Sequence, residues 1–450
     1  MLKPRFVALI ALCIFSVTTF AADNPVASTP PMGWNSWDSY AEGITEQQVR
    51  ANADKMAQEL KPFGYQYVVI DEGWYLTNAE KRSKPEESKF AMNGDGQFIP
   101  DPARYPSSVS GAGFKPLADY IHSLGLKFGI HILRGIPREA VEKNLPIAGS
   151  SFHAADAADT TAVCPWNVYN YGVKNDPAGA AYYDSILKLY AGWGVDFVKV
   201  DCIADHPFSP DDIRMLHEAI KKTGRPIVLS LSPGPTQLEH YDFIKQYANM
   251  WRVSNDFWDH WDLWKGNEWS ESLKQEFATT AKWAGKTGPG AWADADMLPL
   301  GFLGPHPGMF EARQTHLTRD EQRTVMTLWA IFRSPLMMGG DLVTLDDWTK
   351  SLLTNRNVLA VDQHSTDNHP VINEPDTVVW TSRPESGKGT YVAVFNTGDT
   401  ERTVSYEWAK LGLKAGSHKV VDLWEHGKGG KAASLKVTLA PHASVLWRVE

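Results

Sequence analysis

Residues 195–203 read V-D-F-V-K-V-D-C-I and place a lysine and an aspartate near the end of an apolar run. Such a run is typical of an interior β-strand, and the alternation of side chains along a strand puts Lys199 and Asp201 on the same face. For a lone lysine–x–aspartate pattern, the simplest interpretation is a structural ion pair at a strand end. The rest of the sequence decides between that interpretation and a functional site.

Seven further apolar runs occur between residues 28 and 365, and amphipathic helical stretches separate them. This alternation is typical of parallel β/α units, and eight runs fit a closed (β/α)8 barrel, which we predict over residues 22–367. A doubly wound sheet would give similar runs and is the alternative. The eight predicted strands are 31–37, 65–71, 126–132, 195–201, 226–232, 249–254, 290–294 and 334–339.

The last part of the chain has a different pattern. After residue 370 the strand-like runs are close together, helical patterns are missing, and Gly-, Asp- and Asn-rich turns separate the runs. This pattern predicts a small antiparallel β-sandwich domain over residues 368–450.

The N-terminus has a basic start, an apolar run too short to span a bilayer comfortably, and small residues near Ala21. We therefore predict a signal peptide at residues 1–21 and export to the periplasm or the medium. Cys13 would leave with this peptide, so Cys164 and Cys202 would be the cysteines of the mature chain. In an oxidising compartment two cysteines suggest one disulfide, although their spacing does not establish contact.

Composition narrows the function classes. The net charge is −9, from 44 basic and 53 acidic side chains, which argues against nucleic acid as a partner. No stretch after the predicted signal peptide is long and apolar enough for a membrane helix. The 18 tryptophans raise the expectation of a carbohydrate ligand, although most would simply fill the core. Oligomeric state cannot be predicted from these features.

Polar residues stand at the predicted carboxyl ends of the strands, where barrel enzymes carry their active sites. Carboxylates, a lysine, an arginine and tryptophans converge there, without Cys/His metal spacing or a Gly-rich phosphate loop. This set suits hydrolysis of a glycosidic bond, which needs one protonated and one ionised carboxyl group. Lys199 would favour the ionised form of Asp201. The partner carboxyl stays open among Asp71, Glu72, Asp256 and Asp296.

Seven motifs in order resemble those of the α-galactosidase family, family twenty-seven of the glycoside hydrolases. They are M-G-W-N-S-W, V-I-D-E-G-W, G-I-H, F-V-K-V-D-C, W-R-V-S-N-D, G-A-W-A-D-A-D-M-L and S-P-L-M-M-G-G-D-L. The resemblance extends into the last domain through V-V-D-L-W and A-P-H-A-S-V-L-W-R-V. It implies a catalytic barrel followed by an antiparallel β domain, a retaining mechanism, and no metal or other cofactor.

The resemblance also assigns roles to residues. Asp201 matches the nucleophile and Asp256 the general acid/base, at the end of an R-x-x-x-D pattern. The remaining matches are residues expected to bind the sugar, namely Trp37, Asp71, Glu72, His131, Lys199, Ser232, Arg252 and Asp296. The leading expectation is an exo-glycosidase for terminal α-D-galactosyl residues.

Departures from the family pattern keep other sugars open. Most members have two aspartates where this chain has Asp71 and Glu72, and the longer acid would shorten the space for C6 and favour β-L-arabinopyranose. His131 replaces a frequent tyrosine and would be either structural or a hydroxyl ligand. Ser232 leaves N-acetyl-α-D-galactosaminides open, and α-1,6-glucan ends are a further alternative. A sugar-binding protein without catalysis is disfavoured because both expected carboxylates are present.

The segment from Arg134 to Gly172 departs most from the family pattern, and we expect it to build part of the pocket rim. Arg134 or Arg138 would contact leaving-group hydroxyls or pair with Glu139. The loop cysteine comes one position earlier than is usual in the family, and a Cys164–Cys202 bridge beside the pocket is the corresponding expectation.

Overall fold

The computed structural model describes residues 26–79, 87–263, 269–305, 311–425 and 427–450. The predicted signal peptide, residues 1–21, lies outside the described residues. No helix among those that are described is long and apolar enough to cross a membrane.

Eight parallel strands form a curled sheet in the order β12-β9-β8-β7-β3-β2-β1-β15. Each lies within one of the eight predicted runs or overlaps it, and the predicted fold class is confirmed. The two edge strands, β12 and β15, share no ladder; a single parallel bridge joins Met338 of β15 to Leu298, four residues after the end of β12. The strands are β1 (Met32–Asn35), β2 (Tyr67–Ile70), β3 (Lys127–Leu133), β7 (Phe197–Asp201), β8 (Val228–Leu231), β9 (Met250–Arg252), β12 (Trp292–Asp294) and β15 (Leu336–Met338).

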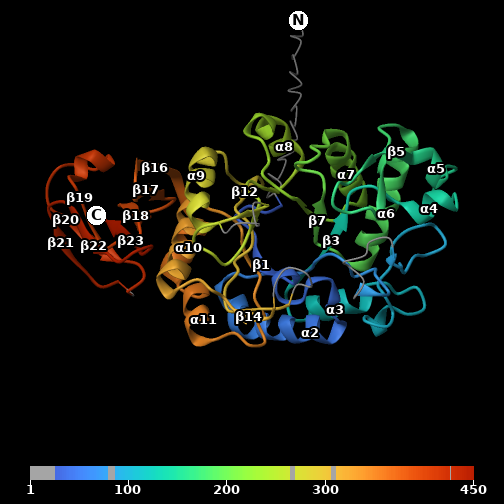
Figure 1. The fold of residues 1–450 in the computed structure, drawn as a ribbon, viewed down its shortest axis with the longest axis horizontal. Coiled ribbons are helices and arrows are strands. Elements are labelled where there is room, and N and C mark those ends of the chain that lie inside the picture. Colours follow the sequence, from blue (N-terminus) through green and yellow to red (C-terminus); the bar gives the residue numbers. More distant parts are fainter. Residues whose placement is uncertain (1–25, 80–86, 264–268, 306–310, 426) are drawn as a thin grey trace, which may run out of the picture.

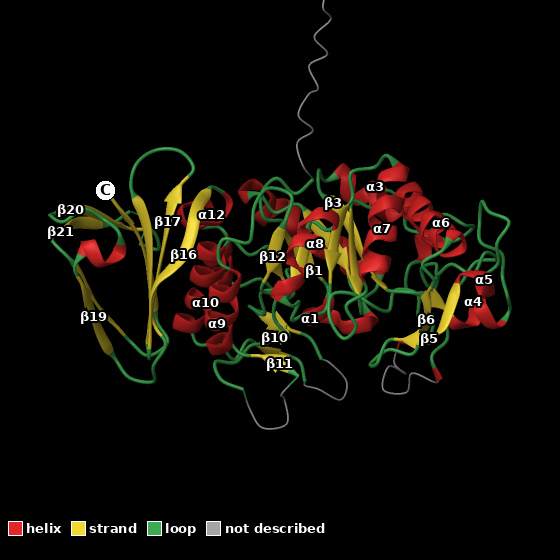
Figure 2. Ribbon diagram, turned by 90° about the horizontal axis from the view of Figure 1, so that it is seen from above, coloured by secondary structure: helices red, strands yellow, loops and turns green. Residues whose placement is uncertain are grey.

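Helices surround this sheet (Figures 1 and 2). Side-chain caps begin several of them: Thr45 and Gln48 form a capping box at α2, and the Asp176 carboxylate accepts two backbone N–H groups at α6. The helices are α1 (Trp37–Tyr40), α2 (Glu46–Lys55), α3 (Lys115–Ser123), α4 (Arg138–Glu142), α5 (Ala154–Ala157), α6 (Pro177–Trp193), α7 (Pro210–Thr223), α8 (Tyr241–Tyr247), α9 (Leu273–Trp283), α10 (Arg319–Phe332), α11 (Asp347–Leu353) and α12 (Arg356–Gln363).

An insertion between β3 and α6 holds a three-stranded antiparallel sheet in the order β4-β6-β5. Its strands are β4 (Ile136–Pro137), β5 (Ala158–Val163) and β6 (Asn170–Val173). We call residues 134–173 the rim insertion. It lies at the end of the molecule opposite the C-terminal domain (Figure 1).

Two short strand pairs complete the barrel domain. β10 (Asp256–Phe257) pairs with β11 (Ser270–Glu271), and β13 (Phe302–Leu303) pairs with β14 (Arg313–Gln314). The first pair carries one of the two predicted catalytic carboxylates, because Asp256 is the first residue of β10.

The C-terminal domain is an antiparallel sandwich, as predicted. A six-stranded sheet in the order β16-β17-β18-β23-β20-β21 and the pair β19-β22 enclose a core that includes Val379, Val392, Val404 and Leu435. Helix α10 is buried along nearly its whole length because it lies between this domain and the barrel (Figure 2). The strands are β16 (Ser365–Glu374), β17 (Thr377–Pro384), β18 (Thr390–Asn396), β19 (Arg402–Tyr406), β20 (His418–Asp422), β21 (Gly429–Ala432), β22 (Leu435–Leu439) and β23 (Ser444–Val449).

Candidate active site

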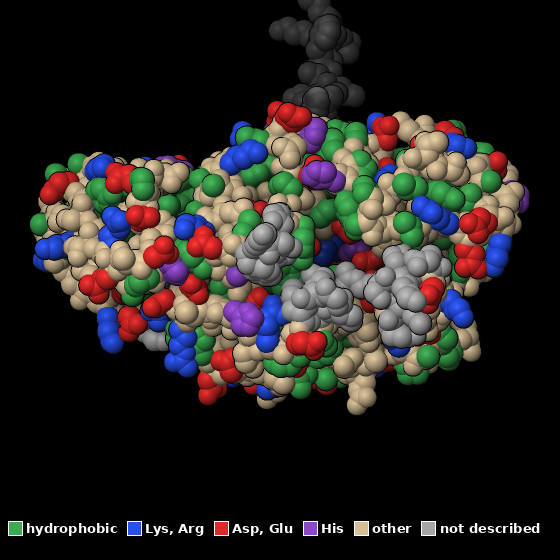
Figure 3. Space-filling model, in the orientation of Figure 1, with side chains coloured by type: hydrophobic (Ala, Val, Ile, Leu, Met, Phe, Trp, Pro, Cys, Tyr) green, Lys and Arg blue, Asp and Glu red, His purple; other side chains and the backbone are tan. Residues whose placement is uncertain are grey.

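A cavity of about 490 Å³ opens at the carboxyl ends of the barrel strands. Figure 3 shows this face hollowed over the barrel, with acidic, basic and histidine side chains visible inside. Strands that are distant in sequence end side by side there, so that their last residues and the loops after them meet in one place. All ten residues predicted from the sequence line the cavity: Trp37, Asp71, Glu72, His131, Lys199, Asp201, Ser232, Arg252, Asp256 and Asp296.

Lys199 forms its ion pair with Asp71. The Lys199 Nζ donates to Asp71 Oδ2 at 2.8 Å, and Asn35 Nδ2 donates to the same oxygen at 2.7 Å. Burial would raise the pKa of Asp71, but the Lys199 ammonium and the His131 ring hold that pKa well below its usual range. The lysine is therefore charged and fixed in the pocket wall, where its remaining N–H groups can bind sugar hydroxyls.

Asp201 lies deep in the cavity, with 15 % of its side chain exposed. Its Oδ2 accepts from Trp166 Nε1 at 3.4 Å and lies 3.9 Å from His131 Nε2. Burial would raise the pKa of Asp201, but the hydrogen bond and charge of His131 and the charge of Lys199 outweigh it and lower that pKa. The carboxylate is thus held ionised, as a nucleophile must be.

His131 has one engaged ring nitrogen. Its Nε2 faces Asp201, whereas its buried Nδ1 has no hydrogen-bond partner among the described residues. Burial lowers the pKa of His131, yet the surrounding carboxylates, Asp71 first, raise it overall. The sequence left two roles open for this residue, a structural one and that of a hydroxyl ligand. The structure places it next to the predicted nucleophile, where it stabilises the negative charge.

Arg252 joins two carboxylates on the other side of the cavity. Its Nη2 lies 3.2 Å from Asp256 Oδ1 and 2.9 Å from Asp296 Oδ2, and it donates to the Asn255 carbonyl at 2.5 Å. The Asp256 side chain is 44 % exposed and so faces the opening, unlike the deeper Asp201. An exposed carboxyl beside the mouth is suited to exchanging protons with a leaving group and with water.

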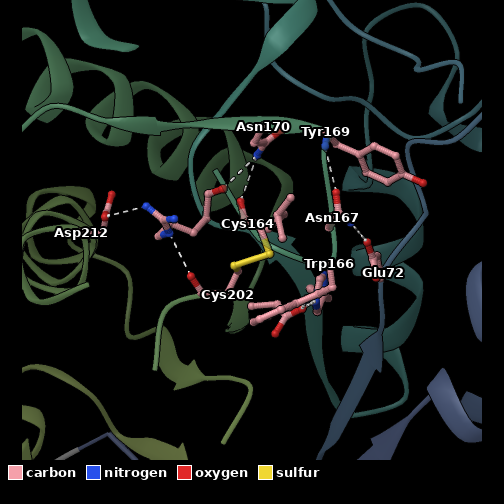
Figure 4. Close-up of a disulfide and its surroundings, with 12 residues drawn as sticks. Glu72, Cys164, Trp166, Asn167, Tyr169, Asn170, Cys202 and Asp212 are labelled. Carbon is pink, nitrogen blue, oxygen red and sulfur yellow. Dashed lines mark hydrogen bonds and ion pairs between the residues drawn. A yellow bond between two sulfur atoms is a disulfide. The ribbon is translucent and has the colours of Figure 1, made fainter. Parts of the chain in front are cut away.

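The rim insertion fixes Glu72 and the surroundings of Asp201 (Figure 4). Asn167 Nδ2 donates a hydrogen bond to Glu72 Oε1, and a disulfide ties Cys164 to Cys202, the residue after Asp201. Glu72 is 8 % exposed and is therefore part of a rigid wall. The segment expected to form the rim also reaches the bottom of the pocket.

Arg134 has a structural role. Its Nη1 pairs with buried Asp212 at 3.4 Å and its Nε donates to the Cys202 carbonyl at 2.9 Å. Arg138 stacks over the ring of Tyr171 at 4.7 Å, and Glu139 pairs with Lys143.

Several residues that line the cavity were not predicted from the sequence. Asp38 is 2 % exposed, and its Oδ2 has no hydrogen-bond partner within the part of the chain that the structure describes. Burial and the charge of Asp296 raise the pKa of Asp38 well above the usual range. Gly339 leaves room for it, since a Cβ there would lie 1.8 Å from that oxygen. Only the adjacency of Asp38 to Trp37 hinted at this position. The other additions are Trp166, His206, Pro233, Gly234, Asn255, Phe257, Trp258, Trp269 and Met297.

The described parts of the chain contain no group of three or more His, Cys, Asp or Glu side chains arranged to hold a metal ion. The chemistry that the cavity offers comes from an ionised carboxylate at its base, an exposed carboxyl at its mouth and polar side chains suited to hydroxyl groups. Together with the barrel, this arrangement defines the class of protein: a (β/α)8-barrel glycoside hydrolase.

The chain belongs to the α-galactosidase family of glycoside hydrolases. The family profile described as alpha galactosidase A matches residues 29–168 and 167–364, and that of the alpha galactosidase C-terminal beta sandwich domain matches residues 374–449. The resemblance inferred from the motifs is thereby confirmed.

Three relatives illustrate the range of the family. The α-galactosidase of Cyamopsis tetragonoloba is 29% identical over 92% of this chain and 84% of its own length. A crystal structure of a β-L-arabinopyranosidase from Geobacillus stearothermophilus is 47% identical, with a TM-score of 0.87 over 94% of this chain and 97% of that one. A putative α-N-acetylgalactosaminidase structure from Bacillus halodurans is 41% identical, with a TM-score of 0.82 over 94% and 98% of the two chains.

Proposed function

We propose that this glycoside hydrolase is a retaining exo-glycosidase that prefers terminal β-L-arabinopyranosides and accepts α-D-galactosides less well. The observation that carries the preference is Glu72, held by Asn167 in the pocket wall. The Geobacillus enzyme, at 47% identity, supports the arabinopyranoside. The curated α-galactosidases, at 27% to 30% identity, support the galactoside as the second substrate.

The two sugars differ at one position. β-L-Arabinopyranose has the ring stereochemistry of α-D-galactopyranose but lacks the C6 hydroxymethyl group. Glu72 is one methylene longer than the aspartate usual in the family, and it cannot turn away without breaking its bond to Asn167. We infer that its carboxylate occupies the space that C6 would need.

The proposed mechanism has two displacements at the anomeric carbon. Asp201 attacks that carbon while Asp256 gives its proton to the departing glycosidic oxygen, so the glycosidic bond breaks and a glycosyl–Asp201 ester forms. Asp256, now ionised, takes a proton from a water molecule that attacks the same carbon and releases Asp201. Lys199 and Asp71 hold ring hydroxyls throughout.

The test compares three nitrophenyl glycosides: β-L-arabinopyranoside, α-D-galactopyranoside and N-acetyl-α-D-galactosaminide. We expect the wild type to show the highest kcat/KM on the arabinopyranoside. Glu72→Asp should shift the ratio of arabinopyranoside to galactoside activity toward galactoside by about tenfold or more, the usual value of one methylene in a tight pocket. A galactoside preference in the wild type, with an unchanged ratio in Glu72→Asp, would refute the assignment.

We also propose that residues 1–21 direct export and are removed. The basic start and short apolar run support this, and the Cys164–Cys202 disulfide suits an oxidising compartment. N-terminal sequencing of the protein recovered from outside the cytoplasm should begin after residue 21; an intact Met1 there would contradict export with cleavage.

A further inference from the structure

A groove of about 690 Å³ adjoins the active-site cavity. Its walls come from the rim insertion and the residue after it, and from the loop after β7 and the start of α7. They include Thr161, Val163, Pro165, Lys174, His206 and Asp211. We call it the rim groove. We propose that the rim groove binds further sugar units of the leaving group, which makes the preferred substrate a neutral oligosaccharide or polysaccharide side chain. The inference rests on the proposed glycosidase function and identifies its substrate class.

The rim groove and the active-site cavity are neighbours that share one lining residue. His206 lines both, and Pro165 lines the groove while the next residue, Trp166, lines the cavity. The Cys164–Cys202 disulfide fixes this boundary one residue from Asp201 (Figure 4). A leaving group that extends from the cavity past His206 would therefore meet the rim groove next.

Exposed tryptophans stand at the mouth of the cavity. Trp166 is 46 % exposed and Trp269 is 45 % exposed, and both line the cavity. Among the tryptophans in the described ranges, these two are the exposed ones. An exposed indole offers a flat apolar face with an N–H at its edge, which matches the apolar face and hydroxyl rim of a pyranose. Trp166 already donates its N–H toward Asp201, so its ring is oriented.

The charged side chains along the rim groove are engaged within the protein, which favours a neutral ligand. The Lys174 ammonium donates to the carbonyls of Ala155 and Asp156, and the Asp211 carboxylate accepts from Arg214. Apolar Val163 and Pro165 alternate with polar side chains along the walls. The Lys174 ammonium is therefore already occupied by two acceptors, whereas sugar hydroxyls would find both donors and acceptors along the walls.

The floor of the groove is preorganised. Buried Arg134 and Asp212 pair there, and Tyr183 donates to Asp212 at 2.5 Å. A rigid floor reduces the entropy lost when a ligand binds, and the volume lies within the roughly 300–1,000 Å³ of ordinary ligand sites.

A matched pair of variants tests the proposal. Val163 and Val168 lie in the same insertion with 39% and 38% exposure, but only Val163 lines the rim groove. The substrates are nitrophenyl β-L-arabinopyranoside and the same sugar linked to β-1,4-galactotetraose. We expect Val163→Trp to lower the ratio of tetraoside to aryl glycoside kcat/KM by about tenfold, near the 1.4 kcal/mol of one such factor. Val168→Trp should leave the ratio as in the wild type. Equal ratios in all three proteins would overturn the inference.

A binding measurement separates this inference from the glycosidase assignment. Calorimetric titration of the three proteins with β-1,4-galactotetraose and β-1,4-mannotetraose needs no turnover. We expect at least one to bind the wild type and Val168→Trp, and to bind Val163→Trp at least tenfold more weakly. If neither binds, or if binding is equal in all three, the rim groove is not a sugar site, even when the aryl glycosides are hydrolysed. If a tetraose binds as expected but no aryl glycoside is hydrolysed, the proposed function is wrong, whereas sugar binding in the rim groove is confirmed.

Discussion

The two predicted catalytic carboxylates differ in their exposure and in the side chains that they face. Asp201 is deep and faces His131, whereas Asp256 is exposed and faces Arg252. The nucleophile and the proton donor can thus be told apart by depth and contact. The sequence placed both at strand ends but left the choice of partner open until the family resemblance was used.

His131 should determine the pH at which the acidic limb of the kcat/KM profile lies. Because its hydrogen bond and charge lower the pKa of Asp201 against the effect of burial, His131→Asn should raise that pKa. The nucleophile would then ionise at higher pH, so the acidic limb of the kcat/KM profile should move upward. The control is His122→Asn, since His122 pairs with Asp196 outside the cavity. An acidic limb that stays in place or moves to lower pH in His131→Asn would contradict the role of His131.

Asp294 should make stability depend on pH. Burial raises the pKa of Asp294 to about 7, although Arg252 opposes this. A carboxyl whose pKa is raised on folding contributes stability below its unfolded value near 4, and this contribution is lost as pH rises through 7. The wild type should therefore lose free energy of unfolding relative to Asp294→Asn between about pH 4 and 7, on the order of 4 kcal/mol. Urea unfolding at several pH values measures the difference; parallel curves for the two proteins would refute the prediction.

At the scale of elements, the barrel strands and the place of the rim insertion were predictable, but the contacts that the insertion makes in the pocket were not. Strands buried on both faces are short apolar runs, and their carboxyl ends meet whatever the loops do, so Lys199 and Ser232 could be placed without a structure. Trp166 and Asn167 belong to no strand end. The contact of Asn167 with Glu72 joins segments 95 residues apart, which no local pattern encodes.

The stability of the protein should depend on the disulfide of the rim insertion. Cys164 and Cys202 are 38 residues apart, and closing a loop of that length stabilises a protein by about 2–4 kcal/mol. The double variant Cys164→Ala/Cys202→Ala should lose about that much free energy of unfolding, and the wild type in reductant should behave likewise. Denaturant unfolding with and without reductant is the measurement. Equal stability of the oxidised wild type and the double variant would contradict a supporting bridge.

At the scale of the whole molecule, the C-terminal domain reaches the segment that carries Asp256. Trp261, five residues after Asp256, stacks on His442 of that domain with ring centroids 3.8 Å apart and planes at 10°. His442 in turn contacts Glu321 on α10 at 2.7 Å and Asp399 at 3.1 Å. The β domain thus holds the proton donor's loop against the barrel.

Removing that contact should impair catalysis. Trp261→Ala should lower kcat by about 10- to 100-fold, the usual cost of a displaced catalytic group. Trp348→Ala is the control, because Trp348 packs with Arg319 on the outside of the barrel. Thermal unfolding of both variants separates loss of activity from loss of fold. An unchanged kcat in folded Trp261→Ala would show that the domain does not position Asp256.

In the proposed mechanism, Asp201 forms a covalent glycosyl intermediate. The most direct measurement is incubation with 2-deoxy-2-fluoro-β-L-arabinopyranosyl fluoride, followed by mass spectrometry of the intact protein and of its peptides. We expect a mass increase of one fluorosugar, located on the peptide that carries Asp201 and missing in Asp201→Ala. A label on another carboxylate, or turnover of this reagent to an inverted product without any label, would contradict it.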